Sequence, residues 1–337
     1  MQSPGIMSEL RYLFDKFTLT LIAVVLAATL VPVHGVGAVI FDWITILAIA
    51  LLFFMHGAKL SREAIIAGAM HWRLHLLVFS CTFIMFPIVG WALKPVLQPL
   101  LGASLYVGVL YLCALPGTVQ SAIAFTSIAR GNIPAAVCSA SASSLIGIVV
   151  TPLLVGWLLG ATGASISTLD AILHISVQLL LPFVAGHLMR PWIGKWMDRN
   201  RNWLKTVDQS SILLVVYTAF SASVIGGLWK TVSLRELAVL VLVCCVLLAL
   251  ALYATMHLAR RLSFNKEDEI TIVFCGSKKS LATGVPMAQV LFASAAVGPA
   301  LLPLMVFHQI QLMVCAVMAQ KYERRFEQPA AVSQQAG

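Results

Sequence analysis

Two adjacent lysines, Lys278 and Lys279, lie inside the apolar stretch from 270 to 292. At about 1.5 Å of rise per residue, Lys278 lies roughly 13 Å beyond Glu269, near the middle of a hydrocarbon layer about 30 Å thick. An ionisable group at that depth is costly unless it faces a polar cavity, so it indicates a functional site. Two ammonium groups can bind an anion. We therefore take both lysines as candidate substrate-binding residues.

Helix-weakening residues interrupt two apolar stretches, and polar side chains gather at both interruptions. One interruption is Leu115-Pro116-Gly117, and the other is Gly276-Ser277-Lys278-Lys279-Ser280, which contains the lysine pair. An interrupted helix exposes N–H and C=O groups that lipid cannot satisfy, so it must line protein or a wet cavity. The N-termini of half-helices favour anions. We predict a shared crevice, lined by Thr118, Gln120, Ser121, Ser280 and Thr283.

The composition is that of an integral membrane protein. Of the 337 residues, 60% are hydrophobic and 10% are charged, and the mean hydropathy is +0.94. Apolar runs recur from end to end and leave no room for a soluble domain of ordinary size. Residues 1–337 are therefore predicted to form a single membrane domain.

Charge and cysteine usage narrow the function classes further. The net charge of +9 does not indicate a nucleic-acid partner, because no basic cluster is interleaved with aromatics on a soluble surface. All seven cysteines lie in apolar spans, and none has metal-ligand spacing with a histidine. Disulfides, a structural zinc and a bound cofactor are not expected.

Apolar runs long enough to cross a bilayer recur along the chain. We predict ten spans, at residues 17–33, 38–57, 74–97, 104–129, 133–160, 169–189, 204–229, 235–258, 269–294 and 298–320. Ten spans place both termini on one side of the membrane. Lysine and arginine crowd the loops on that side, and only Lys94, Lys230 and Arg235 lie opposite. The positive-inside rule therefore predicts that both termini are cytoplasmic.

Ten spans divide into two sets of five. Because each set has an odd number of spans, the second set enters the membrane in the opposite orientation to the first. We predict inverted five-helix repeats over about 17–160 and about 169–320, followed by a cytoplasmic tail at 321–337. The two interruptions fall in the fourth span of each set. Interrupted helices in corresponding positions are the best sequence indicator of a binding site at the membrane midplane.

Several separated motifs resemble the bile acid:sodium symporter family, solute carrier family 10. They are Leu115-Pro116-Gly117, Ala129-Arg130-Gly131-Asn132, Thr151-Pro152, Phe274-Cys275-Gly276-Ser277-Lys278-Lys279-Ser280-Leu281, Gly284-Val285-Pro286-Met287 and Phe307-His308-Gln309. The resemblance covers nearly the whole chain. It is strongest to the SBF-like bacterial branch related to the seventh human member.

The resemblance implies a panel domain and a core domain, with spans four and nine broken and crossing in the core. Substrate would lie beside the crossing and be carried by alternating access. In this family, polar residues of span ten lie near the substrate, which adds His308 and Gln309 to the candidate site. The same resemblance implies a bacterial inner membrane protein.

The sodium ligands of the family are only partly present. Symporters of the family hold sodium with residues after the span-four break, with span five, and with a glutamate and a glutamine of span nine. Ser121 matches a hydroxyl ligand and Ser139 lies in span five, but Ala122 replaces an asparagine and Lys278 falls near the glutamine. We hypothesise that a lysine ammonium, assigned first to Lys278, substitutes for the coupling cation. Adjacent ammonium groups repel each other, and this repulsion favours the release of a proton by one of them. A proton is therefore a second candidate coupling ion beside sodium.

Together these features predict a secondary-active transporter of an organic anion. The family resemblance implies that this anion is a steroid or bile-acid-like conjugate or another amphipathic carboxylate or sulfate. A sodium-dependent symporter of the same type is one alternative, and a membrane protein that binds an anion without transporting it is another. No midplane Asp pair, HExxH motif or GxSG serine with a base is present, so an enzyme is not expected. The expected partners are a small organic anion and the lipid bilayer, and the sequence does not determine the oligomeric state.

Overall fold

The computed structural model describes residues 16–59, 71–160 and 169–333, and all regular structure in these ranges is helical. The elements are α2 (Lys16–Leu30), α3 (Val36–Lys59), α5 (Trp72–Ser80), the π-helical turn η1 (Cys81–Met85), α6 (Phe86–Ala92), α7 (Lys94–Ala114), α8 (Gln120–Ile128), α9 (Ile133–Gly160), α10 (Leu169–Arg199), α11 (Arg201–Ile225), α12 (Leu228–Thr231), α13 (Leu234–Arg261), α14 (Lys266–Gly276), α15 (Leu281–Leu291) and α16 (Ser294–Ser333).

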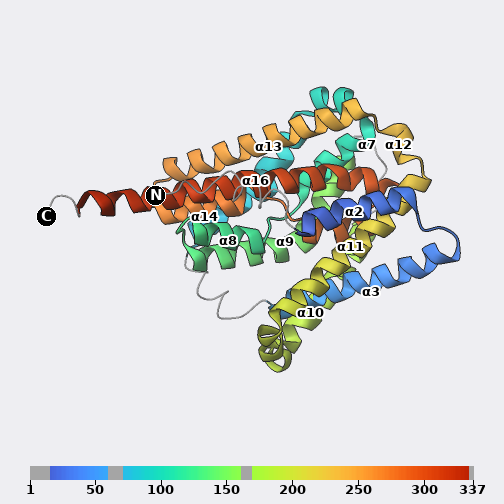
Figure 1. Ribbon diagram of the computed structural model, residues 1–337, viewed down its shortest axis with the longest axis horizontal. Helices are drawn as coiled ribbons and strands as arrows, with labels where there is room; N and C mark the ends of the chain where they lie inside the picture. The colour runs from blue at the N-terminus through green and yellow to red at the C-terminus, as the bar shows by residue number, and fades with distance from the viewer. Residues whose placement is uncertain (1–15, 60–70, 161–168, 334–337) are drawn as a thin grey trace.

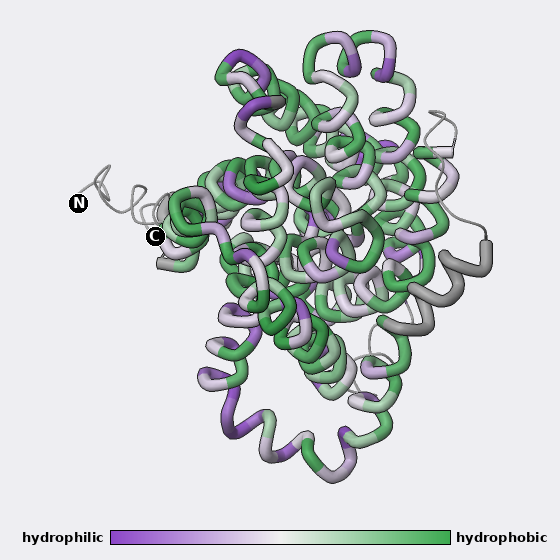
Figure 2. The backbone as a smooth tube through the Cα atoms, turned by 90° about the vertical axis from the view of Figure 1, so that its right-hand side faces the viewer, coloured by the Kyte–Doolittle hydropathy of each residue, from purple (hydrophilic) through white to green (hydrophobic). Residues whose placement is uncertain are grey.

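Seven helical stretches within the described ranges are long and apolar enough to cross a membrane: Val36–Lys59, Trp72–Ala92, Lys94–Ala114, Ile133–Gly160, Arg201–Ile225, Leu234–Arg261 and Ser294–Arg324. Large apolar side chains also cover the outer surface, including Leu47 on α3, Leu181 on α10 and Leu242 on α13. Figure 2 shows hydrophobic residues on the outermost helices as well as in the interior. Apolar surface of this extent requires a lipid environment. The predicted class, an all-α multi-pass membrane protein, is confirmed.

The helices form two groups (Figure 1). In the four-helix group, α3 packs along α10, while α11 contacts both α2 and α3. In the second group, which holds the other helices, α16 contacts α7, α13 and α15, and α14 contacts α5, α8 and α9. Because α11 also contacts α15 and α16, this helix of the four-helix group lies against the second group.

The contact between α3 and α10 depends on two glycines. A Cβ atom added to Gly57 would lie 1.9 Å from the carbonyl oxygen of Phe183, and one added to Gly186 would lie 1.9 Å from the carbonyl oxygen of Phe54. The two backbones therefore touch at a reciprocal pair of positions that only glycine can occupy. Close approach through small residues is a usual way for helices to associate in a membrane.

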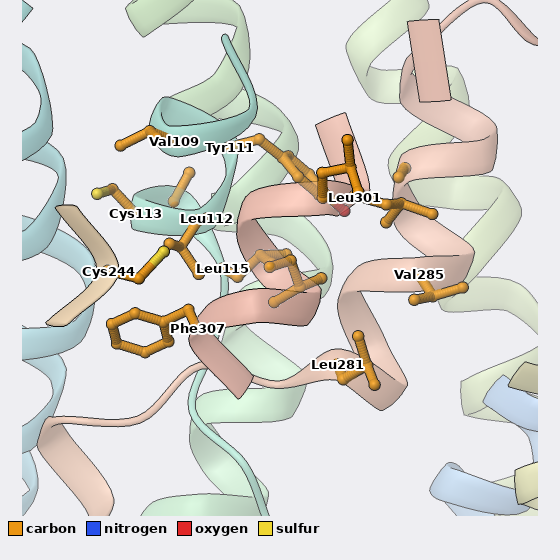
Figure 3. Close-up of a cluster of buried hydrophobic side chains, with 14 of the residues drawn as sticks. Val109, Tyr111, Leu112, Cys113, Leu115, Cys244, Leu281, Val285, Leu301 and Phe307 are labelled. Carbon is orange, nitrogen blue, oxygen red and sulfur yellow. The ribbon is translucent and has the colours of Figure 1, made fainter. Parts of the chain in front are cut away.

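The chain is non-helical at both positions where interruptions are predicted. Pro116 has no N–H and disfavours the helical conformation in the preceding residue, and Leu115 is extended (φ −72°, ψ 152°). Thus α7 ends at Ala114 and α8 begins at Gln120. On the other side, α14 ends at Gly276 and α15 begins at Leu281. Figure 3 shows apolar side chains of α7, α13, α15 and α16 gathered around Leu115.

Candidate functional site

The two interrupted segments are in direct contact. The backbone N–H of Ser280 donates to the carbonyl oxygen of Pro116 (2.9 Å). A Cβ atom on Gly117 would lie 3.0 Å from the carbonyl oxygen of Cys275, so a larger residue would force the segments apart. The N–H of Gly117 donates to Ser143 Oγ of α9 (3.1 Å). The polar backbone groups released by each break are thus partly satisfied by the other break and by α9.

Lys279 joins three segments through backbone carbonyl oxygens. Its Nζ donates to the carbonyls of Thr82 (2.9 Å), Cys113 (2.8 Å) and Leu115 (2.7 Å). It also lies 4.2 Å from the ring centre of Phe86. Cys113 and Leu115 are at the C-terminal end of α7, where carbonyl groups lack intrahelical partners and carry the negative end of the helix dipole. A fully buried cation is therefore held by groups that favour positive charge.

The backbone of Lys279 is fixed separately by Gln311 of α16. Lys279 N–H donates to Gln311 Oε1 (2.9 Å), and Gln311 Nε2 donates to the Lys279 carbonyl (2.8 Å). The same Nε2 lies 2.8 Å from His308 Nδ1. Gln311 thus connects the break before α15 to the histidine on α16.

Lys278 has a different environment. Its Nζ lies 4.2 Å from the ring centre of Phe125 and 5.4 Å from that of Phe274. The side chain is fully buried, and Nζ has no hydrogen-bond acceptor within the described part of the chain. Aromatic faces attract a cation but do not replace its hydrogen bonds.

A cavity of about 310 Å³ lies between the two helix groups, and we call it the central cavity. Its wall includes the first residues of both half-helices, Gln120 of α8 and Leu281 of α15. Ser280 caps α15 by accepting from the N–H of Thr283 (3.2 Å). From the other side, α2, α3 and α11 contribute Phe17, His56, Lys205, Asp208, Gln209 and Ile212. Two helix N-termini therefore lie in the wall of one cavity.

Six of the predicted site residues line this cavity: Thr118, Gln120, Ser121, Ser280, Thr283 and His308. Lys278 and Lys279 do not line it, since their side chains lie behind the breaks in the protein interior. Gln309 is half-buried and is not part of the cavity wall. Ser139 is buried with its Oγ 2.6 Å from His75 Nδ1. The cavity residues are thus brought together, while the two lysines, Gln309 and Ser139 are placed elsewhere.

The sequence analysis predicted neither the α11 side of the cavity nor the two hydrogen bonds between Gln311 and the Lys279 backbone. Asp208 lines the cavity and forms an ion pair with Lys59 of α3. Asp208 lies only four residues inside the predicted span 204–229. A carboxylate within a predicted span was the one feature of the sequence that could have indicated this residue. Nothing in the local sequence indicated that α11 faces the two interrupted helices.

The comparisons with known proteins agree on one family. A model of the SBF-like CPA transporter family matches residues 15–324. An uncharacterized protein of Pseudomonas aeruginosa is 66% identical over 325 residues, covering 96% of this chain and 98% of that protein. YfeH of Escherichia coli is 59% identical over 326 residues, covering 95% and 96%. The sodium/bile acid cotransporter 7 of Xenopus tropicalis is 28% identical over 320 residues, covering 93% and 92%.

Proposed function

Because this chain belongs to the SBF-like CPA transporter family, and is thus a transporter and not an enzyme, we propose that it carries an organic anion by secondary-active, alternating-access transport. The observation that carries the proposal is the pair of half-helix N-termini, at Gln120 and Leu281, in the wall of one cavity. Each terminus presents the positive end of a helix dipole, and first-turn N–H groups have no partner within their own helix. Such a site favours an anion over a neutral or cationic solute.

The central cavity also supports a class of substrate. Its volume of about 310 Å³ accommodates a small organic molecule. Thr118, Ser121 and His308 are polar, whereas Val119, Ile212 and Leu312 are apolar. An amphipathic carboxylate or sulfate, including a steroid or bile-acid-like conjugate, matches a wall of this mixed character. Sodium/bile acid transport in the name of the Xenopus relative is in line with this class.

We further propose ten spans in two inverted repeats within a single membrane domain. The seven long apolar helices, together with α2, α10 and the interrupted pair α14–α15, make ten if α8 is counted with α7. The two interruptions then fall at corresponding places, which is the plan of many secondary transporters. With the lysine and arginine bias of the loops, this count supports cytoplasmic termini and an inner-membrane location.

For coupling, we propose that the Lys279 ammonium stands in for the cation that symporters of the related type bind. Three carbonyl oxygens within 2.9 Å of Nζ form the kind of oxygen cage that a metal cation would otherwise need. Lys278 Nζ has no such oxygen ligands among the described residues, so Lys279 is favoured over Lys278 as the substitute for the coupling cation. A second cation beside it would be repelled, so transport should not require sodium.

The test uses purified protein and a panel of organic anions. Thermal stabilisation by an anion is expected with and without sodium. Thr118→Val removes a cavity hydroxyl and should weaken anion binding about 5–10-fold, the effect of one lost hydrogen bond of roughly 1–1.5 kcal/mol. Thr126→Val is the control, because Thr126 is a threonine of α8, the helix that follows Thr118, and lies outside the cavity wall. This variant should bind the anion like the wild type.

Counterflow of the best anion in proteoliposomes then separates the remaining candidates. Counterflow without sodium supports the proposed carrier. Counterflow that requires sodium supports a sodium-dependent symporter instead. Binding without counterflow would indicate a membrane protein that binds an anion without moving it, and binding of no anion would refute the proposed substrate class.

A further inference from the structure

A second cavity, of about 360 Å³, lies next to the central one, and we call it the basic cavity. It is built from the end of α3, the start of α8, and the turn that joins α10 to α11. Its charged lining residues are Lys59, Arg190, Asp198, Arg201 and Lys205. The proposed transport cycle assigns no task to this cavity.

The ion pairs of the basic cavity leave an excess of positive charge. Arg201 Nη2 lies 3.1 Å from Asp198, and Arg190 Nη2 lies 4.0 Å from the same carboxylate. Lys59 is paired with Asp208, which belongs to the central cavity. Lys205 has no ion-pair partner among the described residues. Three of the four cations thus pair with two carboxylates, and Lys205 is the cation that remains available to a ligand.

The two cavities share two lining residues. Gln120 and Lys205 line both of them. Gln120 is the first residue of α8, so an anion held at that helix N-terminus lies beside the entrance to the basic cavity. A ligand could therefore have one end at the half-helix N-termini and the other among the basic side chains.

We propose that the basic cavity is a second anion subsite, and that the preferred substrate is an organic dianion with one anionic group in each cavity. This inference rests on the proposed function of the central cavity. Lys205 contacts the second anionic group, and Arg190 and Arg201 add to the local positive potential. An organic monoanion of the same length fills the central cavity alone and leaves the basic cavity without an anionic group.

The experiment compares paired ligands of equal length: the straight-chain α,ω-dicarboxylates from six to twelve carbons and the corresponding monocarboxylates. Affinity is measured by thermal stabilisation of the full-length wild type and of Lys205→Gln. At least one dicarboxylate should bind the wild type about 5–10-fold more tightly than its monocarboxylate partner. Lys205→Gln should lower dicarboxylate affinity more than monocarboxylate affinity, and so remove most of that preference, because Lys205 lines both cavities.

Lys195→Gln is the matched control, because Lys195 is an exposed lysine of α10 that lines neither cavity. It should keep the preference for the dicarboxylate. The inference is overturned if no dicarboxylate exceeds its partner, if both lysine variants lose the preference equally, or if anionic lipid in nanodiscs removes it, which would assign the basic cavity to a lipid headgroup. Monocarboxylate binding in any of these cases would leave the proposed central anion site standing.

Discussion

Lys279→Met is expected to destabilise the protein by about 3 kcal/mol or more, because three buried carbonyl oxygens lose their hydrogen-bond donor at roughly 1–3 kcal/mol each. Cys113 and Leu115, whose carbonyls lie at the end of α7, are fully buried, so solvent cannot reach these carbonyls to replace the ammonium. The measurement is thermal unfolding of the purified protein in detergent, followed by tryptophan fluorescence.

Lys278→Met is the control within the same pair, and the opposite result is expected. The Lys278 ammonium has aromatic contacts but no hydrogen-bond acceptor among the described residues. Replacing it with an apolar side chain of similar length therefore removes a group that is costly to bury, and stability should stay within about 1 kcal/mol of the wild type or rise. Equal destabilisation by the two substitutions would contradict the different roles assigned here to the two lysines.

Gly57→Ala is expected to disrupt the four-helix group, at a cost of about 3 kcal/mol or more. The added methyl carbon would lie 1.9 Å from the carbonyl oxygen of Phe183, and this atom belongs to backbone that cannot turn aside. Separating α3 from α10 also displaces Lys59 and Arg190 from the basic cavity. We expect a lower unfolding temperature and a smaller yield of monodisperse protein.

Gly160→Ala provides the comparison for this effect. Gly160 is the last residue of α9, and a Cβ atom there meets no atom of the described residues within 4 Å. The same chemical change should therefore leave stability unchanged or raise it slightly, since alanine favours the helix over glycine. If both substitutions shift the unfolding temperature by the same amount, the close contact between α3 and α10 is not the cause.

The sequence by itself determined the class of the protein and the places where its helices break. Composition and the length of the apolar runs require a membrane environment, and these are properties of the chain that no packing changes. Pro116 removes a backbone donor and disfavours helix before it, so that break is a local effect. The polar residues next to the breaks could be predicted for the same reason, and Thr118, Ser121 and Ser280 do line the central cavity.

Only the tertiary structure decided what each lysine does and what closes the site. Lys278 and Lys279 are chemically identical neighbours, but successive helical or extended positions point in different directions and meet different partners. The carbonyls that hold Lys279 come from residues more than 160 positions away, at Thr82, Cys113 and Leu115. The far wall of the cavity comes from α11, which carries Asp208. Long-range packing of this kind leaves no local pattern, since it depends on how separate helices meet after each has formed.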